Sequence, residues 1–210
     1  AELAKKYDAY VVTDEVYEHI VYAPNKHIYM QALEGMRDRT IVCNSLSKTY
    51  SITGWRLGYV IANPQIIDRV KKVHDFLTVG AAAPLMEAAT VGLKFDDKYY
   101  DELAAHYAHM KEVFVGGLKK LGLKYTDPQG AYYVLVDVSE FGVKDDVKFC
   151  EWMAQFVGVA AVPGSSFFRE DVHNLVRFHF AKQDDTLNEA IKRLATLKEK
   201  AMNAKNVDWR

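Results

Sequence analysis

The chain lacks most of the features that mark secreted, membrane or nucleic-acid-binding proteins. Its 210 residues contain only two cysteines, Cys43 and Cys150, which excludes a disulfide framework and suits a reducing cytoplasm. The formal net charge of -1 provides no overall field to attract nucleic acid or an anionic membrane. There is no apolar run long enough to span a bilayer, no signal-peptide pattern at the start and no H-E-x-x-H metal motif. We therefore expect a cytoplasmic protein whose partners are neither nucleic acid nor membrane.

What the sequence does contain is the pattern of an α/β protein. Hydrophobic residues make up 50% of it and charged residues 26%, which is typical of a globular fold. Short β-branched runs predict buried strands, and Pro64 is placed to open a helix near its first turn. The alternation of strands and helices favours an α/β layered sheet. The strands are expected at 10–13, 40–43 and 58–62, and the helices at 64–77 and 84–93.

The second half of the chain has a different pattern. Apolar residues from Leu103 to Leu121 recur every three or four positions and predict one long helix that ends near Gly122. After it, shorter elements predict a small α+β domain from about residue 124. Its strands are expected at 132–136, 159–162 and 175–181, and its helices at 148–156 and across 187–197.

One segment carries more chemistry than a hydrophobic core needs. Residues 45–59 read SLSKTYSITGWRLGY, which combines Lys48, several hydroxyl groups, Arg56 and two glycines in a stretch without periodicity. Such a stretch suits a phosphorylated ligand held beside a reactive amine, because a guanidinium and hydroxyl groups bind phosphate well. Two rival interpretations fail. The S-x-x-K of β-lactamases lacks its S-D-N and K-T-G partners here, and a Walker A loop lacks its glycines.

A second group of polar residues follows the first predicted strand. Asp14 comes directly after residues 10–13, and Tyr17 lies three positions further on. Open α/β sheets bind ligands at the carboxyl ends of their strands, and a carboxylate placed there requires a partner. The D-x-x-Y spacing is weak evidence by itself but becomes strong when the lysine segment follows about 30 residues later.

Together these motifs resemble those of class I/II aminotransferases, the fold-type-I enzymes that use pyridoxal 5'-phosphate (PLP). The resemblance implies that Lys48 holds the cofactor aldehyde as a Schiff base and that Ser45 and Arg56 bind its phosphate. It also implies that Asp14 keeps the pyridine nitrogen protonated, which makes the ring an electron sink. Tyr17 would hydrogen-bond the phenolic oxygen of the cofactor. Lys48, Asp14 and Tyr17 are therefore the predicted catalytic residues.

Arg177 is the predicted substrate-binding residue. It lies in the middle of the apolar strand 175–181, where an unpaired charge is costly. From the residues alone, a structural salt bridge and a bidentate clamp on a carboxylate are both open. The resemblance favours the clamp, which would hold the α-carboxylate of the substrate. His179 is expected to be a packed core histidine. The blocks 129–133 and 162–167 also match the family but receive no chemical role.

The resemblance also implies an organisation for the chain. Residues 1–95 would be the C-terminal part of a large PLP-binding domain, residues 96–123 an interdomain helix and residues 124–210 a small domain. The glycine-rich phosphate loop and the aromatic residue that stacks on PLP have no counterpart in the sequence. We expect the chain to be the C-terminal half of an enzyme that is a homodimer at full length, and to be inactive alone.

The implied function is transamination between an amino acid and a 2-oxo acid. The C-terminal blocks 165–168 and 180–187 are most similar to the branch that acts on kynurenine, glutamine, methionine and aromatic amino acids. Two alternatives share the scaffold. One is a PLP-dependent carbon–sulfur β-lyase or aminocyclopropane-carboxylate synthase, and the other is an aminotransferase-like effector domain of a transcription regulator.

Overall fold

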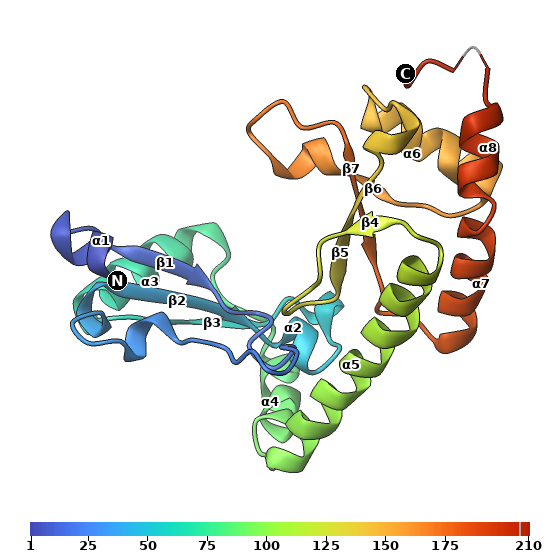
Figure 1. Ribbon diagram of the computed structural model, residues 1–210. Coiled ribbons are helices and arrows are strands. Elements are labelled where there is room, and N and C mark those ends of the chain that lie inside the picture. The colour runs from blue at the N-terminus through green and yellow to red at the C-terminus, as the bar shows by residue number, and fades with distance from the viewer. Residues whose placement is uncertain (206) are drawn as a thin grey trace. The chain divides into compact units, whose positions relative to one another are not determined.

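The computed structural model describes residues 1–205 and 207–210, which form two compact units, residues 1–104 and 105–210 (Figure 1). The boundary falls inside α5 (Asp97–Lys120), the long helix that the sequence predicts over 96–123. The assignment of the flanking parts to a large and a small domain stays a prediction. In the described part of the chain, no helix is both long and apolar enough to cross a membrane.

The first unit contains a three-stranded sheet with the order β1-β2-β3. Strand β1 runs parallel to β2, and β3 runs antiparallel to it. The α/β layer arrangement is therefore confirmed. The elements of this unit, before α5, are α1 (Glu2–Lys6), β1 (Val11–Asp14), β2 (Thr40–Ser45), α2 (Leu46–Thr49), β3 (Gly58–Ile61), α3 (Pro64–Leu77) and α4 (Ala83–Gly92).

The helix predicted over 64–77 is confirmed, and its start follows from local chemistry. Pro64 occupies the first turn, and the side-chain oxygen of Asn63 accepts the backbone N–H of Gln65 at 3.0 Å.

The prediction of three buried strands is wrong in part. β2 contains fully buried side chains, but β1 is half-exposed and every residue of β3 is exposed. Because α3 has no buried residue, it does not seal a face of this sheet.

The second unit contains a four-stranded antiparallel sheet with the order β4-β5-β7-β6. The predicted strand 159–162 forms only as the pair Val162–Pro163, and the predicted strand 175–181 ends at His179. The predicted last helix divides into two. The elements are β4 (Lys124–Tyr125), β5 (Tyr133–Asp137), α6 (Asp146–Trp152), β6 (Val162–Pro163), β7 (Leu175–His179), α7 (Asp184–Leu194) and α8 (Leu197–Asn203).

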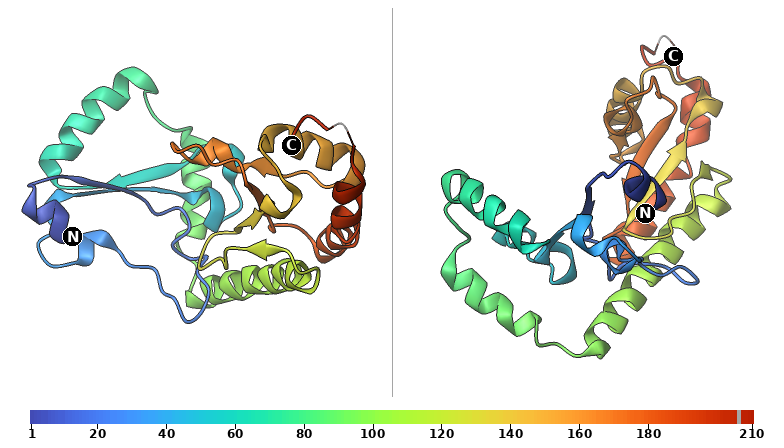
Figure 2. Two further views of the ribbon diagram at one scale, coloured as in Figure 1. Left: turned by 45° about the horizontal axis from the view of Figure 1, so that its top comes forward. Right: turned by 90° about the vertical axis from the view of Figure 1, so that its left-hand side faces the viewer.

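One face of this second sheet forms the core. Val134, Val136, Val176 and Phe178 alternate along β5 and β7 and are buried there. Helices α5 and α7 cover this face (Figures 1 and 2). Phe114 of α5 contacts Phe178, with ring centroids 5.8 Å apart.

The opposite face of the sheet carries the alternate residues of the same strands, including Arg177, which is half-buried. His179 shares this face and is exposed, so the prediction of a packed core histidine is wrong. The reason is the period of two, which places His179 with Arg177 and away from the buried Phe178. This face of β7 therefore carries its polar side chains.

Candidate active site

The lysine segment begins at the carboxyl end of β2, where the strand passes directly into α2. Ser45 is the N-cap of α2, and its Oγ accepts the backbone N–H of Ser47 at 3.1 Å. The same hydroxyl donates to the carbonyl oxygen of Leu57 at 3.1 Å. Lys48 lies in the single turn of helix that this cap starts and is half-buried. The strand end and the cap thus determine where the lysine backbone lies.

Arg56 is placed beside this helix start by the β2–β3 pairing. Ser45 pairs with Gly58, and a side chain on Gly58 would have its Cβ 2.6 Å from the carbonyl oxygen of Asn44, so only glycine fits there. Arg56 itself has a left-handed backbone with φ of 56°. Its Nη1 donates to the carbonyl oxygen of Thr53 at 2.9 Å, and the side chain is exposed. A non-glycine residue held at positive φ beside Ser45 is typical of a functional site.

Asp14 and Tyr17 lie at the same end of the sheet as Ser45. Asp14 is the last residue of β1 and pairs with Cys43 in the parallel register, two residues before the end of β2. Its Oδ1 accepts the backbone N–H of Val16 at 3.3 Å, and the side chain is exposed. Tyr17 follows in a turn closed by the hydrogen bond from the Ile20 N–H to the Tyr17 carbonyl oxygen, 2.9 Å. The ring of Tyr17 is half-buried.

A polar network that the sequence did not reveal anchors the turn carrying Tyr17. Glu15 is only 4% exposed, accepts the Thr13 hydroxyl at 2.9 Å and lies 3.0 Å from Nε2 of His27. Glu18 accepts the amide of Asn44 at 2.6 Å, which joins the turn to β2. Both glutamates are interleaved with Asp14 and Tyr17 in the sequence, and only the fold shows their partners. The bond between Glu18 and Asn44 thus attaches this turn to β2, and the buried Glu15 joins its start to His27.

The pKa values of Tyr29 and His19 are shifted by their places in this network. Burial, followed by the hydrogen bond to Glu18, raises the pKa of Tyr29 to about 12. The pKa of His19 is lowered, mainly because its ring is partly buried, although Glu18 acts in the opposite direction. Both shifts favour the neutral form, of the Tyr29 hydroxyl and of the His19 ring.

Tyrosines at the start of α5 hold the end of the lysine segment. The hydroxyl of Tyr99 donates to the carbonyl oxygen of Thr49 at 2.7 Å, and the hydroxyls of Tyr50 and Tyr100 lie 2.8 Å apart. Thr49 and Tyr50 are the two residues that follow Lys48. These contacts lie within the first unit and restrain the short helix that carries the lysine.

Arg177 belongs to the second unit, in the middle of β7. Its neighbours across the sheet are Leu135 of β5 and Val162 of β6. The guanidinium Cζ lies 3.7 Å from the centroid of the Phe167 ring and 4.2 Å from that of Tyr133. Among the ion pairs of the described residues, none includes Arg177, so the structural salt bridge that the residues left open is not formed. The two aromatic rings come from the blocks 162–167 and 129–133, to which the sequence assigned no role.

The structure thus groups the predicted residues by unit. The first unit brings the predicted cofactor residues to one end of its sheet, and the second unit presents Arg177 between two aromatic side chains. The residues of the first group are Asp14, Tyr17, Ser45, Lys48 and Arg56.

Comparison with known proteins identifies the family. The family model described as aminotransferase class I and II matches residues 1–194. The chain belongs to this family. It is 36% identical to the methionine aminotransferase of Escherichia coli over 192 residues, which cover 91% of this chain and 50% of that relative. Human kynurenine–oxoglutarate transaminase 3 is 34% identical over 210 residues, covering 90% of this chain and 46% of that relative.

The solved structures agree with this assignment to the aminotransferase fold. The N-succinyldiaminopimelate aminotransferase of Mycobacterium tuberculosis matches with a TM-score of 0.88 and 34% identity, covering 94% of this chain and 52% of that one. The fold is therefore that of the type I enzymes, as the motifs predicted. This chain spans about half the length of the relatives that it matches.

The residues of the first unit fit PLP in the chemistry of their donor groups. A dianionic phosphate takes an exposed guanidinium and a serine hydroxyl, which Arg56 and Ser45 supply. A protonated pyridine nitrogen takes a carboxylate, which the strand end supplies in Asp14. An aldehyde takes a primary amine, which is Lys48. The phosphate, the ring nitrogen and the aldehyde of the cofactor thus each have a chemically suitable group at this end of the sheet.

Proposed function

We propose that the protein transfers an amino group between an amino acid and a 2-oxo acid with pyridoxal 5'-phosphate as cofactor. The observation that carries the proposal is the arrangement at the end of β2. There the Ser45 cap starts the helix of Lys48, and the Ser45–Gly58 pairing brings Arg56 beside it. Few other chemistries need an amine, hydroxyl groups and a guanidinium anchored within a dozen residues. The family membership supports the same reaction.

Each residue of the first unit then has a role. When bound, the cofactor supplies an electron-withdrawing ring that stabilises negative charge on the substrate Cα. Ser45 and Arg56 bind and orient its phosphate. Asp14 would hold the pyridine nitrogen in its protonated form, and Tyr17 would donate a hydrogen bond to the phenolic oxygen. Lys48 would hold the cofactor aldehyde through its amine, and as a free amine it would carry the proton taken from the substrate Cα.

Arg177 provides the substrate side of the proposal. A guanidinium that lies on aromatic rings and has no carboxylate partner among the described residues is suited to a bidentate bond with the α-carboxylate shared by amino and 2-oxo acids. The relatives are named for methionine, kynurenine, N-succinyldiaminopimelate and aspartate at similar identities. This range supports a carboxylate-directed mechanism. Within it, we place the chain in the branch acting on kynurenine, glutamine, methionine or aromatic amino acids, as its C-terminal blocks indicate.

The broader setting follows from the family resemblance. We propose that the full-length protein is a cytoplasmic homodimer and that residues 1–95 and 124–210 belong to its large and small domains. The free thiols of Cys43 and Cys150 support a reducing compartment. Size-exclusion chromatography with light scattering on the protein at its native length tests the dimer, and a monomer at micromolar concentration contradicts it.

Covalent trapping tests the function. The protein at its native length is loaded with PLP, reduced with borohydride, digested and analysed by mass spectrometry, and the label is expected on Lys48. Lys26→Ala, which removes an exposed lysine of the same unit, is the matched control and should label normally. The released product is then assayed. Formation of a 2-oxo acid that depends on a second 2-oxo acid supports transamination, whereas pyruvate and a thiol released without a co-substrate identify a β-lyase.

A further inference from the structure

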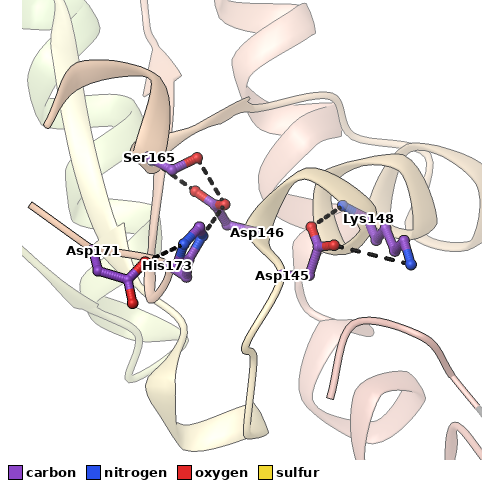
Figure 3. A network of polar contacts seen from close by, with 6 residues as sticks. All are labelled: Asp145, Asp146, Lys148, Ser165, Asp171 and His173. Atoms are coloured by element: carbon purple, nitrogen blue, oxygen red, sulfur yellow. Dashed lines mark hydrogen bonds and ion pairs between the residues drawn. The ribbon is translucent and has the colours of Figure 1, made fainter. Parts of the chain in front are cut away.

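Among the described residues of the second unit, one carboxylate is completely buried. Asp146, at the start of α6, is 0% exposed. Its Oδ2 accepts the backbone N–H of Ser165 at 2.7 Å, and its Oδ1 accepts the Ser165 hydroxyl at 2.9 Å and lies 3.1 Å from Nδ1 of His173 (Figure 3). Burial raises the pKa of this carboxyl, but the hydrogen bonds from Ser165 and His173 outweigh it, and the net pKa is lowered. Asp146 is therefore an anion that contacts three polar groups, two of Ser165 and one of His173.

Capping of α6 does not explain this carboxylate. The N-cap of the helix is the neighbouring Asp145, whose Oδ1 accepts the backbone N–H of Lys148 at 3.1 Å. Figure 3 shows that the two aspartates point to different partners, Asp145 toward Lys148 and Asp146 toward Ser165 and His173. A buried charge is costly unless its hydrogen bonds compensate for the lost water. The hydrogen bonds of Asp146 therefore indicate which segment it holds in place.

That segment is the short 3-10 helix Gly164–Phe167, which we call the β6 turn because it follows β6. It lies directly against β7. A Cβ on Gly164 would be 2.4 Å from the carbonyl oxygen of Leu175, so the turn approaches the strand as closely as glycine permits. Both bonds from Ser165 fix the second residue of this turn to α6. The turn is thus held between β7 on one side and Asp146 on the other.

The last residue of the β6 turn is Phe167, whose ring contacts the guanidinium of Arg177, 3.7 Å from Cζ to the ring centroid. Phe167 is 45% exposed, so burial alone does not hold its ring in place. Stacking on a ring occupies the face of a guanidinium and leaves its N–H donors in the plane available for a carboxylate. The position of the ring therefore limits the plane in which those donors point.

We infer that Asp146 is a positioning residue for carboxylate recognition: it binds Ser165, holds the β6 turn and so keeps Phe167 against Arg177. The inference rests on the proposed role of Arg177 as the site of the substrate carboxylate. It makes the bidentate geometry at Arg177 depend on a carboxylate that touches neither the substrate nor the arginine. A loosened β6 turn frees the guanidinium to rotate, which weakens a two-bond fork more than a single contact.

The central test is Asp146→Asn with Asp145→Asn as its matched control. The asparagine at 146 is nearly the same size but lacks the charge, whereas asparagine at 145 remains a good helix cap. 4-Fluorophenylalanine is placed at position 167 of the protein at its native length, and its fluorine NMR signal is recorded without substrate. We expect the signal in Asp146→Asn to move toward that of an Arg177→Ala reference, and Asp145→Asn to keep the wild-type signal.

Kinetics then link the ring to recognition. The substrate is the amino acid that the wild type turns over best, and the primary amine lacking its carboxylate is tested as a competitive inhibitor. Asp146→Asn should raise KM about tenfold, as for the loss of one charge-assisted hydrogen bond, with kcat within about a factor of three. Inhibition by the amine should not change. If the KM of the amino acid and the inhibition constant of the amine rise together in Asp146→Asn, the inference is overturned. It is also overturned if this variant keeps both the wild-type fluorine signal and the wild-type KM.

Two further variants keep the test decisive if Asp146→Asn does not fold. Ser165→Ala removes the hydroxyl donor and should raise KM, whereas Ser165→Thr keeps a hydroxyl and should have the wild-type KM. A wild-type KM in Ser165→Ala, or an equally raised KM in both variants, overturns the inference. Arg177→Lys distinguishes a failure of this inference from a failure of the proposed function. An unchanged KM in Arg177→Lys removes the carboxylate role of Arg177, whereas a raised KM there with a wild-type KM in Asp146→Asn removes only the role of Asp146.

Discussion

Asp14 pairs with Cys43 in the parallel register of β1 and β2, so its carboxylate lies at the sheet end from which Ser45 starts the helix of Lys48. Two motifs about 30 residues apart in the sequence are thereby joined by one pair of strands. The parallel direction is essential, because in an antiparallel pair the carboxyl ends of the two strands would lie at opposite ends of the sheet. The proposed cofactor site follows from this strand pairing.

The first prediction concerns Asp14. Asp14→Asn should retain some PLP but lose transamination by orders of magnitude, because a neutral amide does not stabilise the protonated pyridine nitrogen. Asp68→Asn, at an exposed position of α3, is the control and should keep wild-type activity. Steady-state formation of 2-oxo acid measures the effect, and absorbance measures cofactor content. Near-normal turnover in Asp14→Asn would contradict the role.

The second prediction concerns Arg177. Arg177→Lys keeps the positive charge but loses the planar fork, so KM for the amino acid should rise about 10- to 100-fold, as expected for a weakened charge-assisted bidentate pair. PLP content should stay at the wild-type level, since no proposed cofactor contact changes. Lys182→Arg, the reverse exchange at an exposed position just after β7, is the matched control and should leave KM unchanged. Unchanged amino-acid binding in Arg177→Lys would make Arg177 a structural residue only.

Local chemistry explains which parts of the structure the sequence predicts. Pro64 is a recognisable helix start in the first turn of α3, and α5 ends near Gly122, whose φ of 65° suits glycine. These signals act within a few residues. The predicted positions of β2 and α3 are correct for the same reason, because strand composition and helix caps are read locally.

The parts that escape prediction depend on contacts between distant residues. Asp146 and Ser165 are 19 positions apart, and Phe167 and Tyr133 meet Arg177 only because β5, β6 and β7 are neighbours in one sheet. No spacing in the sequence signals those pairs. Exposure of β1 and β3 escapes prediction as well, since β-branched runs indicate a strand but do not show what covers it.

The third prediction concerns the packing of α5 against α7 and compares two adjacent glycines. A Cβ on Gly117 would lie 2.5 Å from two atoms of Ile191, whereas nothing lies within 4 Å of a Cβ on Gly116. Gly117→Ala should lower the free energy of unfolding by about 1–3 kcal/mol through overpacking. Gly116→Ala should raise it by about 0.5–1 kcal/mol through helix propensity. Urea unfolding measures both, and equal effects of the two changes would show that α5 and α7 are not in this close contact.

The last prediction concerns the pH dependence of His173. Hydrogen bonds to Asp146 first and Asp171 second, at 3.1 and 2.8 Å, raise the pKa of His173 above its ordinary value. A histidine whose folded pKa is raised stabilises the fold fully below the unfolded pKa of about 6.5, and this contribution is lost as pH rises through the folded pKa. The stability difference between the wild type and His173→Gln should therefore be largest at acidic pH and shrink toward alkaline pH.

His179 provides the contrast for that experiment. Partial burial of its ring, then the charges of Lys182 and Arg177, lower the pKa of His179, so protonation of this group costs stability and His179→Gln should relieve that cost at acidic pH. The two variants should thus change stability in opposite directions as pH falls below about 6.5. Urea unfolding across this range measures the sign, and NMR titration of the two imidazoles measures the pKa values directly. If His173 titrates below His179, the Asp146–His173–Asp171 network does not hold a charged imidazole, because both carboxylates favour the protonated ring.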